Sequence, residues 1–393
     1  MIPHKVKALA VIGANYGDEG KGAVVNALSR QYKPEYVIRF NGGGQAGHTV
    51  QLEDGTRHVF STLGSGTFYG AKTYYTEDVL VSQGRILEEF QVMDRLIGGQ
   101  PYLDINQHAR VITDLDIIAN QFGELLRRDA GLPHGTCGMG IGECVQRHLR
   151  GGPTSPFWSS HSDPEEDRRW FERRLGQISG ETGVPLDKYQ NQINSALSIW
   201  GNTPLHRGWG PTIRSVTEPR FTSLFPTVIF EGAQGLLLDE DDPDHQPHVT
   251  WSKTGLANVI KECKKHGWDL DAVYYVTRPY LTRHGEGPMH AALADKPGNE
   301  IQWGEDGEPL DGTNVTNKWQ GSLRKAPMDW TKFHERVSKD YQLAEDAFPE
   351  DPPDLRFAVT CSDQVTPYWA MPGKTIDGRW GPYPVLYVNG LKG

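Results

Sequence analysis

The sequence predicts an α/β protein with a large, mostly parallel central sheet flanked by helices. Short apolar runs, spread over the whole chain, each lead into glycines or polar residues, as the buried strands of a parallel sheet do. The first run is followed by AVVNALSRQ (23–31), whose apolar residues have helical spacing. This repeated order of strand, glycine loop and helix is typical of open α/β sheets.

Five segments are expected to form strands of this sheet. They are VKALAVIGAN (6–15), EYVIRFNG (35–42), TVIFEGAQG (227–235), AVYYVTRPY (272–280) and LRFAVTCSD (355–363). The carboxyl ends of parallel strands meet at one edge of a sheet, which is where ligands bind. We therefore expect the five segments to converge on one cleft.

The chain of 393 residues is expected to form a single domain over residues 1–393. Helices near 84–98 and 115–130 should cover the sheet. Residues 150–170 and 291–312 are rich in proline, glycine and charge, which predicts surface excursions.

Composition restricts the class of function. The net charge of −10 argues against nonspecific binding to nucleic acid. No apolar run approaches the roughly 20 residues of a membrane span, so no membrane partner is expected. The four cysteines form no C-x-x-C pair, which favours a reduced, cytoplasmic setting.

The segment GANYGDEGKG (13–22) resembles a phosphate-binding loop of the form G-x-x-x-x-G-K-[ST]. Gly20 and Lys21 are in place, but Gly22 replaces the hydroxyl residue. Backbone N–H groups of the glycines and the positive end of the next helix suit a phosphate. The internal carboxylate of Asp18 suits Mg²⁺ binding and proton abstraction during phosphoryl transfer. The alternative is a tight turn with solvated acids.

A second glycine loop, NGGGQAGHTV (41–50), follows the second predicted strand. His48 lies in this loop, and an imidazole suits an oxygen that gains negative charge. A structural histidine is the alternative interpretation.

The segments GDEGKG (17–22) and AGHTV (46–50) together resemble the adenylosuccinate synthetase family. The resemblance continues in order along nearly the whole chain. The further matching segments are HGTCGMGIG (134–142), FEGAQGLLLD (230–239), HVTWS (248–252), VTRPYLTRHGEGP (276–288), GSLRK (321–325) and TCSD (360–363).

This resemblance implies the P-loop-like fold of that family and an NTP-dependent carbon–nitrogen ligase. The enzyme would phosphorylate the 6-oxygen of a purine nucleotide and then displace phosphate with L-aspartate. Asp18 would be the base, His48 would stabilise the charge on the 6-oxygen, and Lys21 would complete the catalytic set. Asp18 and the Gly47 carbonyl would hold Mg²⁺.

The resemblance also implies two sets of binding residues. The nucleotide-binding set is Asn15, Gly17, Glu19, Gly20, Gly22, Gly44, Gln45, Ala46, Thr136, Cys137, Gln234, Thr250, Asp363 and Gly390. The aspartate-binding set is Thr316, Ser322 and Arg324.

Departures from the family pattern bear on the choice of substrate. Cys137 stands where the family has a second threonine near the acceptor phosphate. Ser322 replaces an arginine near the ribose, and Cys361 replaces a lysine that stacks on guanine. These changes resemble a viral branch of the family that joins aspartate to dGMP, on the way to diaminopurine DNA. We favour dGMP with ATP or dATP over IMP with GTP.

The family is usually a homodimer, with an arginine that reaches the partner's site. Arg147 and Arg150 are the candidates for this arginine. The expected location is the cytoplasm, of the host if the protein is viral.

The residues of the two glycine loops argue against two other classes of function. A P-loop NTPase switch predicts Ser or Thr after Lys21, where this chain has Gly22. A non-catalytic nucleotide-binding protein predicts damage to Asp18 or His48, and both are present. The segment DEDDPDHQPH (239–248) lacks helical ligand spacing and is interpreted as a solvated loop.

Overall fold

The computed structural model describes residues 5–151, 164–202, 212–289, 323–361 and 385–388. Four of the predicted site residues, Thr316, Ser322, Asp363 and Gly390, lie outside these ranges, as does the predicted excursion at 291–312. The excursion predicted at 150–170 is described only in part, and its last residues, from Pro164, begin helix α5 (Pro164–Thr182).

Nine strands in the described part of the chain form one sheet, in the order β15-β14-β11-β1-β10-β2-β5-β7-β9. Every pair of neighbours in this sheet is parallel. The strands are β1 (Lys7–Gly13), β2 (Tyr36–Arg39), β5 (Lys72–Tyr75), β7 (Leu103–Asn106), β9 (Ile213–Val216), β10 (Thr227–Glu231), β11 (Asp269–Thr277), β14 (Asp354–Thr360) and β15 (Val385–Val388). The predicted parallel sheet is confirmed, and β1, β2, β10, β11 and β14 are the five predicted strands.

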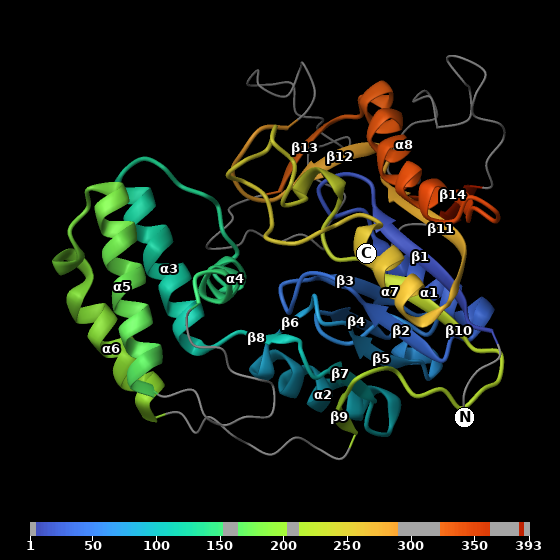
Figure 1. Ribbon diagram of the computed structural model, residues 1–393, viewed down its shortest axis with the longest axis horizontal. Coiled ribbons are helices and arrows are strands. Elements are labelled where there is room, and N and C mark those ends of the chain that lie inside the picture. The colour runs from blue at the N-terminus through green and yellow to red at the C-terminus, as the bar shows by residue number, and fades with distance from the viewer. Residues whose placement is uncertain (1–4, 152–163, 203–211, 290–322, 362–384, 389–393) are drawn as a thin grey trace.

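Helices cover both faces of this sheet (Figure 1). Side chains of β1 alternate between the faces because successive residues of a strand point in opposite directions. Leu9 and Val11 pack with α1 (Lys21–Tyr32). Ala10 and Ile12 belong to the opposite cluster, with α7 (Ala257–His266) and α8 (Trp330–Ala347). The apolar run of β1 is therefore buried on both faces.

Helix α2 (Gln83–Ile97) packs Ile86 and Met93 against β5 and β7, as predicted for residues 84–98. The helix predicted at 115–130 forms as α3 (Asp114–Asp129), but the expectation that it covers the sheet was wrong. Its apolar face packs with α5 and α6 (Gln190–Asn202) in a separate helical cluster. With α4 (Ile141–Leu149), these helices form a group beside the sheet, in teal and green in Figure 1.

Short elements complete the described chain. Two antiparallel hairpins pair β3 (His48–Gln51) with β4 (Arg57–Phe60) and β12 (Tyr280–Arg283) with β13 (Arg324–Pro327). A parallel pair joins β6 (Leu80–Val81) to β8 (Arg110–Val111), and single 3₁₀ turns span Thr67–Tyr69, Leu186–Tyr189 and Leu236–Leu238.

The described helices include none that combines the length and the apolar character of a membrane span. The four cysteines, all within the described residues, form no disulfide.

Candidate active site

The site lies at the carboxyl edge of the sheet. The glycine loop after β1, the glycine loop after β2, the turn after β10 and the hairpin after β11 all leave the sheet at this edge. The loop after β1 is locked to β14, because Thr360 Oγ1 donates a hydrogen bond of 2.7 Å to the Glu19 carbonyl. The structure therefore confirms that the five predicted segments converge on one edge of the sheet.

The Glu19 carboxylate holds the first loop from inside. Its Oε1 accepts hydrogen bonds from the backbone N–H groups of Asn15 (3.0 Å) and Gly17 (2.8 Å). Burial raises its pKa, while Lys21 Nζ, 3.5 Å from Oε2, opposes that shift. Lys21 also donates to the Gly17 carbonyl at 2.7 Å. The loop is thus closed on itself around a buried ammonium group.

The absence of a side chain at Gly22 has a steric cause. A β-carbon at this position would lie 2.7 Å from the Cβ of His48, which is closer than side chains tolerate. Helix α1 therefore starts against the second glycine loop. The Ser or Thr of an ordinary P-loop cannot be placed here without moving His48.

The loop's other carboxylate points outward. The Asp18 side chain is 30% exposed, and its Oδ2 lies 3.9 Å from Nε2 of His284, in the loop after β12. Of the two acids in the loop, Glu19 is bonded within the loop and Asp18 lies beside His284. Gly47 is exposed in the second glycine loop.

His48 is buried and paired with Glu231 at the end of β10. Its Nδ1 lies 2.8 Å from Glu231 Oε1. Burial lowers the pKa of His48, partly opposed by Glu231. Burial alone would raise the pKa of Glu231, but His48, Arg39 and Ser65 together lower it to about 2. Ser65 donates to Glu231 from both its N–H (2.9 Å) and its hydroxyl.

The turn after β10 is held in place by Asn41, which follows β2. Asn41 accepts from Ala233 N–H at 2.8 Å and donates to the Ala233 carbonyl at 3.0 Å. The next residue, Gln234, has a positive φ of 56°. Its Oε1 and that of Gln45 are buried without hydrogen-bond partners within the described structure. Both amides are therefore available to a ligand.

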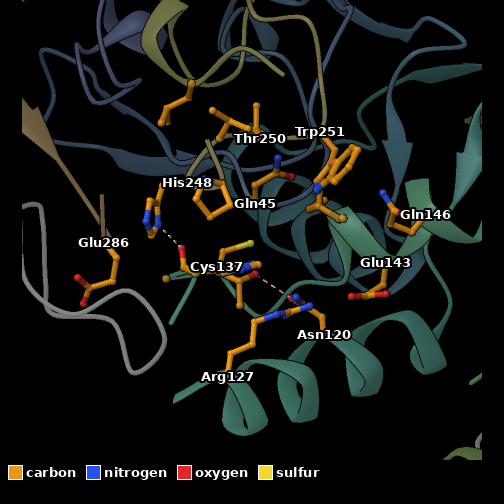
Figure 2. A pocket seen from close by; sticks show the side chains of 18 of the residues that line it. Gln45, Asn120, Arg127, Cys137, Glu143, Gln146, His248, Thr250, Trp251 and Glu286 are labelled. Atoms are coloured by element: carbon orange, nitrogen blue, oxygen red, sulfur yellow. Dashed lines mark hydrogen bonds between the residues drawn. The ribbon is translucent and has the colours of Figure 1, made fainter. Parts of the chain in front are cut away.

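A pocket of about 380 Å³ opens beside these loops (Figure 2). Five predicted nucleotide-binding residues line it: Gln45, Thr136, Cys137, Gln234 and Thr250. His284, the neighbour of Asp18, lines it as well. Residues from the chain's beginning, middle and later parts thus meet around one cavity. Burial raises the pKa of Cys137, so this residue presents a neutral thiol.

The helical group and three loop positions supply pocket residues that the sequence did not predict. They include Asn120 and Arg127 from α3, Glu143 from α4, Arg174 from α5 and His134, His248 and Trp251 from loops. The α3 residues belong to no motif, and only the packing of this helix beside the sheet brings them to the site. Glu231 was also missed, although it stands inside the quoted segment EGAQG.

The predicted arginines differ in environment. Arg147 is buried and forms a two-pronged pair with Asp116, from Nε at 3.0 Å and Nη2 at 2.8 Å. Its guanidinium is therefore engaged within its own chain. Arg150 is exposed and lines the chain's own pocket. Arg324, at the start of β13, donates to the Gly285 carbonyl at 2.7 Å, close to the glycine-rich end of the same hairpin.

The segment at 239–248 is mostly exposed or half-buried, as expected for a solvated loop, but His245 is fully buried. Its ring connects Asp242 Oδ2 (3.1 Å) to the hydroxyl of Tyr16 (3.1 Å). This chain of contacts ties the segment to the first glycine loop, next to Gly17.

The side chains at this edge suit a magnesium ion that is bound partly by substrate phosphates better than a metal bound only by protein side chains. The described residues contain no group of three or more His, Cys, Asp or Glu that could hold a metal. Mg²⁺ is commonly bound by one or two carboxylates together with substrate phosphates and water. Asp18, with its partly exposed carboxylate in the first glycine loop, has the chemistry of such a donor.

A phosphate-binding loop, a buried imidazole–carboxylate pair and a nucleotide-sized pocket at one sheet edge define a nucleotide-dependent α/β enzyme. A profile described as adenylosuccinate synthetase matches residues 10–154 and 214–312. The adenylosuccinate synthetase of Desulfotalea psychrophila is 30% identical over 305 residues, covering 76% of this chain and 67% of the relative. That of Desulforapulum autotrophicum is 30% identical over 302 residues, covering 75% and 67%. The chain belongs to the adenylosuccinate synthetase family, and it is therefore a carbon–nitrogen ligase of purine nucleotide synthesis.

Solved structures show the same fold. Fully ligated adenylosuccinate synthetase from Plasmodium falciparum superposes with a TM-score of 0.61 at 20% identity, covering 92% of this chain and 78% of that one. Succinoaminodeoxyadenylate synthetase of cyanophage S-2L, bound to dGMP and dATP, superposes with a TM-score of 0.56 at 18% identity, covering 92% and 86%. Enzymes of this family use a purine nucleoside monophosphate, a nucleoside triphosphate and L-aspartate, and are generally Mg²⁺-dependent.

Proposed function

We propose that this ligase joins L-aspartate to dGMP, with ATP or dATP as phosphoryl donor, to give the N6-succino-2-amino-2′-deoxyadenylate. The observation that carries the choice of acceptor is WQGSLR (319–324), where Ser322 replaces the family's arginine near the ribose. Cys361, in place of the lysine that stacks on guanine, favours an adenine donor. The cyanophage enzyme of the same fold, bound to dGMP and dATP, adds support.

The residues at the sheet edge can carry the reaction. The outward carboxylate of Asp18 is the only acid of the first loop free to take the N1 proton of the purine, because Glu19 is bonded to backbone N–H groups. Removing that proton makes the 6-oxygen a nucleophile. Mg²⁺, held by Asp18 and the Gly47 carbonyl, would neutralise the phosphates and favour the ionised carboxylate.

His48 would donate a hydrogen bond to the 6-oxygen as charge develops there. Glu231 fixes the ring by accepting from Nδ1, which leaves Nε2 for the ligand. Lys21, buried within the loop, provides a fixed positive charge beside the transferred phosphoryl group. Arg324 would bind the aspartate carboxylate through its guanidinium fork.

The remaining expectations belong to the same proposal. The nucleotide-binding and aspartate-binding sets would act as the resemblance implies, in one domain. We further propose a homodimer located in the cytoplasm, of the host if the protein is viral.

The test is an aspartate-dependent phosphate-release assay that crosses dGMP, GMP and IMP with ATP, dATP and GTP. The proposal predicts the highest kcat/KM for dGMP with an adenine nucleotide. A preference for IMP with GTP would restore the second candidate, an ordinary adenylosuccinate synthetase. Phosphate release that does not require aspartate would contradict both.

A further inference from the structure

Within the described residues, one cation of the pocket makes no hydrogen bond or ion pair through its side chain. Arg127, in the last turn of α3, is 9% exposed and lines the pocket. Its guanidinium makes no hydrogen bond or ion pair with any residue that the structure describes. Figure 2 shows the side chain rising from α3 toward the cavity, on the side of Asn120. A buried, unpaired guanidinium is costly unless an anion binds it.

The side chain is held in place by the helix that carries it. A β-carbon at Gly123, one turn earlier, would lie 3.3 Å from Nη1 of Arg127, so the guanidinium lies over this glycine. On the same face, Asn120 Oδ1 accepts from the Thr136 hydroxyl (3.1 Å) and from Gly140 N–H (3.2 Å). Arg127 is thus fixed beside the glycine loop that contains Thr136.

The acids around Arg127 are otherwise engaged. Glu143 is paired with Arg174, at 2.6 Å from Nε and 3.1 Å from Nη2. Glu124 accepts from Gly135 N–H at 3.0 Å and lies 3.4 Å from Arg128. Glu181 is exposed and accepts from Gln177. Burial lowers the pKa of Arg127, yet an arginine stays charged at neutral pH.

The two walls of the pocket differ in chemistry. The sheet-edge wall presents the amide groups of Gln45 and Gln234, with His284 next to Asp18. Neutral amides suit a base and its sugar, and the proposed function puts the reacting purine on this side. The α3 wall presents the unpaired guanidinium of Arg127, which suits a phosphate dianion.

We propose that Arg127 binds the 5′-phosphate of the acceptor nucleotide, so that this chain supplies the phosphate's cation from α3 of its own pocket. This inference rests on the proposed function, because it takes the pocket as the acceptor site. The planar fork can bind two phosphate oxygens at once.

The role of Arg127 is tested by measuring equilibrium binding of ligands with and without the 5′-phosphate to proteins with and without this arginine. Binding of dGMP and IMP is compared with that of deoxyguanosine and inosine, for the natural protein, Arg127→Leu and Arg127→Lys. We expect Arg127→Leu to weaken both monophosphates at least about tenfold and the nucleosides by less than about twofold. Arg127→Lys keeps the charge but loses the fork, so its loss should be smaller and again confined to the monophosphates. Arg173→Gln removes an exposed arginine from α5 and is the matched control.

The outcomes separate the two proposals. Equal weakening of nucleotides and nucleosides would make Arg127 a structural residue and overturn the inference. Monophosphate binding unchanged in both Arg127 variants would overturn it as well. If the natural protein binds neither dGMP nor IMP, the proposed function itself fails, whatever Arg127 does. If circular dichroism shows that Arg127→Leu does not fold, the binding data for Arg127→Lys alone decide whether Arg127 binds the phosphate.

Discussion

Nδ1 of His48 lies 2.8 Å from Oε1 of Glu231, and both side chains are buried at the carboxyl edge of the sheet. Because the pKa of Glu231 is lowered to about 2, its carboxylate is ionised at neutral pH and can only accept. Nδ1 must therefore carry the proton, and Nε2 can donate only when the ring is an imidazolium. This pair makes the protonation state of His48 depend on Glu231, which is fully buried.

Replacing Glu231 should impair turnover through His48. We expect Glu231→Gln to reduce kcat about tenfold or more, with little change in the KM for the acceptor nucleotide. Burial holds the pKa of His48 below 6.5 and Glu231 opposes this, so the variant's pKa should be lower still. The fall of kcat/KM as pH rises should then begin at a lower pH in the variant, which a pH series of initial rates measures.

His48→Asn provides the comparison for Glu231→Gln. It should cost on the order of 10²-fold in kcat, as loss of an oxyanion stabiliser does. If Glu231 acts only through His48, the double variant should be no slower than His48→Asn. Additive losses would show that Glu231 has a separate role.

Restoring the P-loop hydroxyl should damage the site. Gly22→Ser places a β-carbon 2.7 Å from that of His48, so we expect a loss of about 1–3 kcal/mol in the free energy of unfolding and a lower kcat. Denaturant titration and the phosphate-release assay measure both. Gly84→Ser is the control, because a β-carbon there meets nothing within 4 Å. A variant with increased, aspartate-independent hydrolysis would instead favour an NTPase switch.

The aspartate site is tested at Arg324. Arg324→Leu should raise the KM for aspartate by about tenfold or more, while the KM for dGMP stays near its natural value, because only the aspartate carboxylate loses its partner. Arg324→Lys should give an intermediate value. An aspartate KM that does not move would put the carboxylate site elsewhere.

Asp18→Ala should abolish turnover and leave nucleotide binding largely intact. The Asp18 carboxylate is partly exposed beside His284, whereas the N–H groups of Asn15 and Gly17 donate to Glu19. Calorimetric binding of dGMP measured beside the rate checks both halves of this prediction. Residual turnover close to the natural rate would remove Asp18 from the role of base.

The sequence was most informative where local pattern decides structure. The apolar runs predicted β1, β2, β10, β11 and β14, because a strand buried on both faces needs a continuous apolar stretch. It was least informative where packing at long range decides. Helical periodicity predicted α3, but nothing in that pattern shows whether the apolar face meets the sheet or other helices.

The same division holds for the site. Gln45, Thr136, Cys137, Gln234 and Thr250 lie in quoted motifs, and the structure brings them to one pocket. Other members, such as Asn120 and Arg127, lie in no motif and reach the pocket only because α3 packs beside the loop at 134–140. Glu231 stands inside a motif, but its pairing with His48 joins residues 183 positions apart.

The proposed mechanism depends most on capture of the phosphoryl group by the purine's own 6-oxygen. Its most direct test starts from dGMP labelled with ¹⁸O at position 6, in a full reaction with aspartate and the triphosphate. The released phosphate is then analysed by mass spectrometry. We expect one ¹⁸O atom in each phosphate formed together with the succino product. Unlabelled phosphate, accompanied by normal product formation, would contradict it.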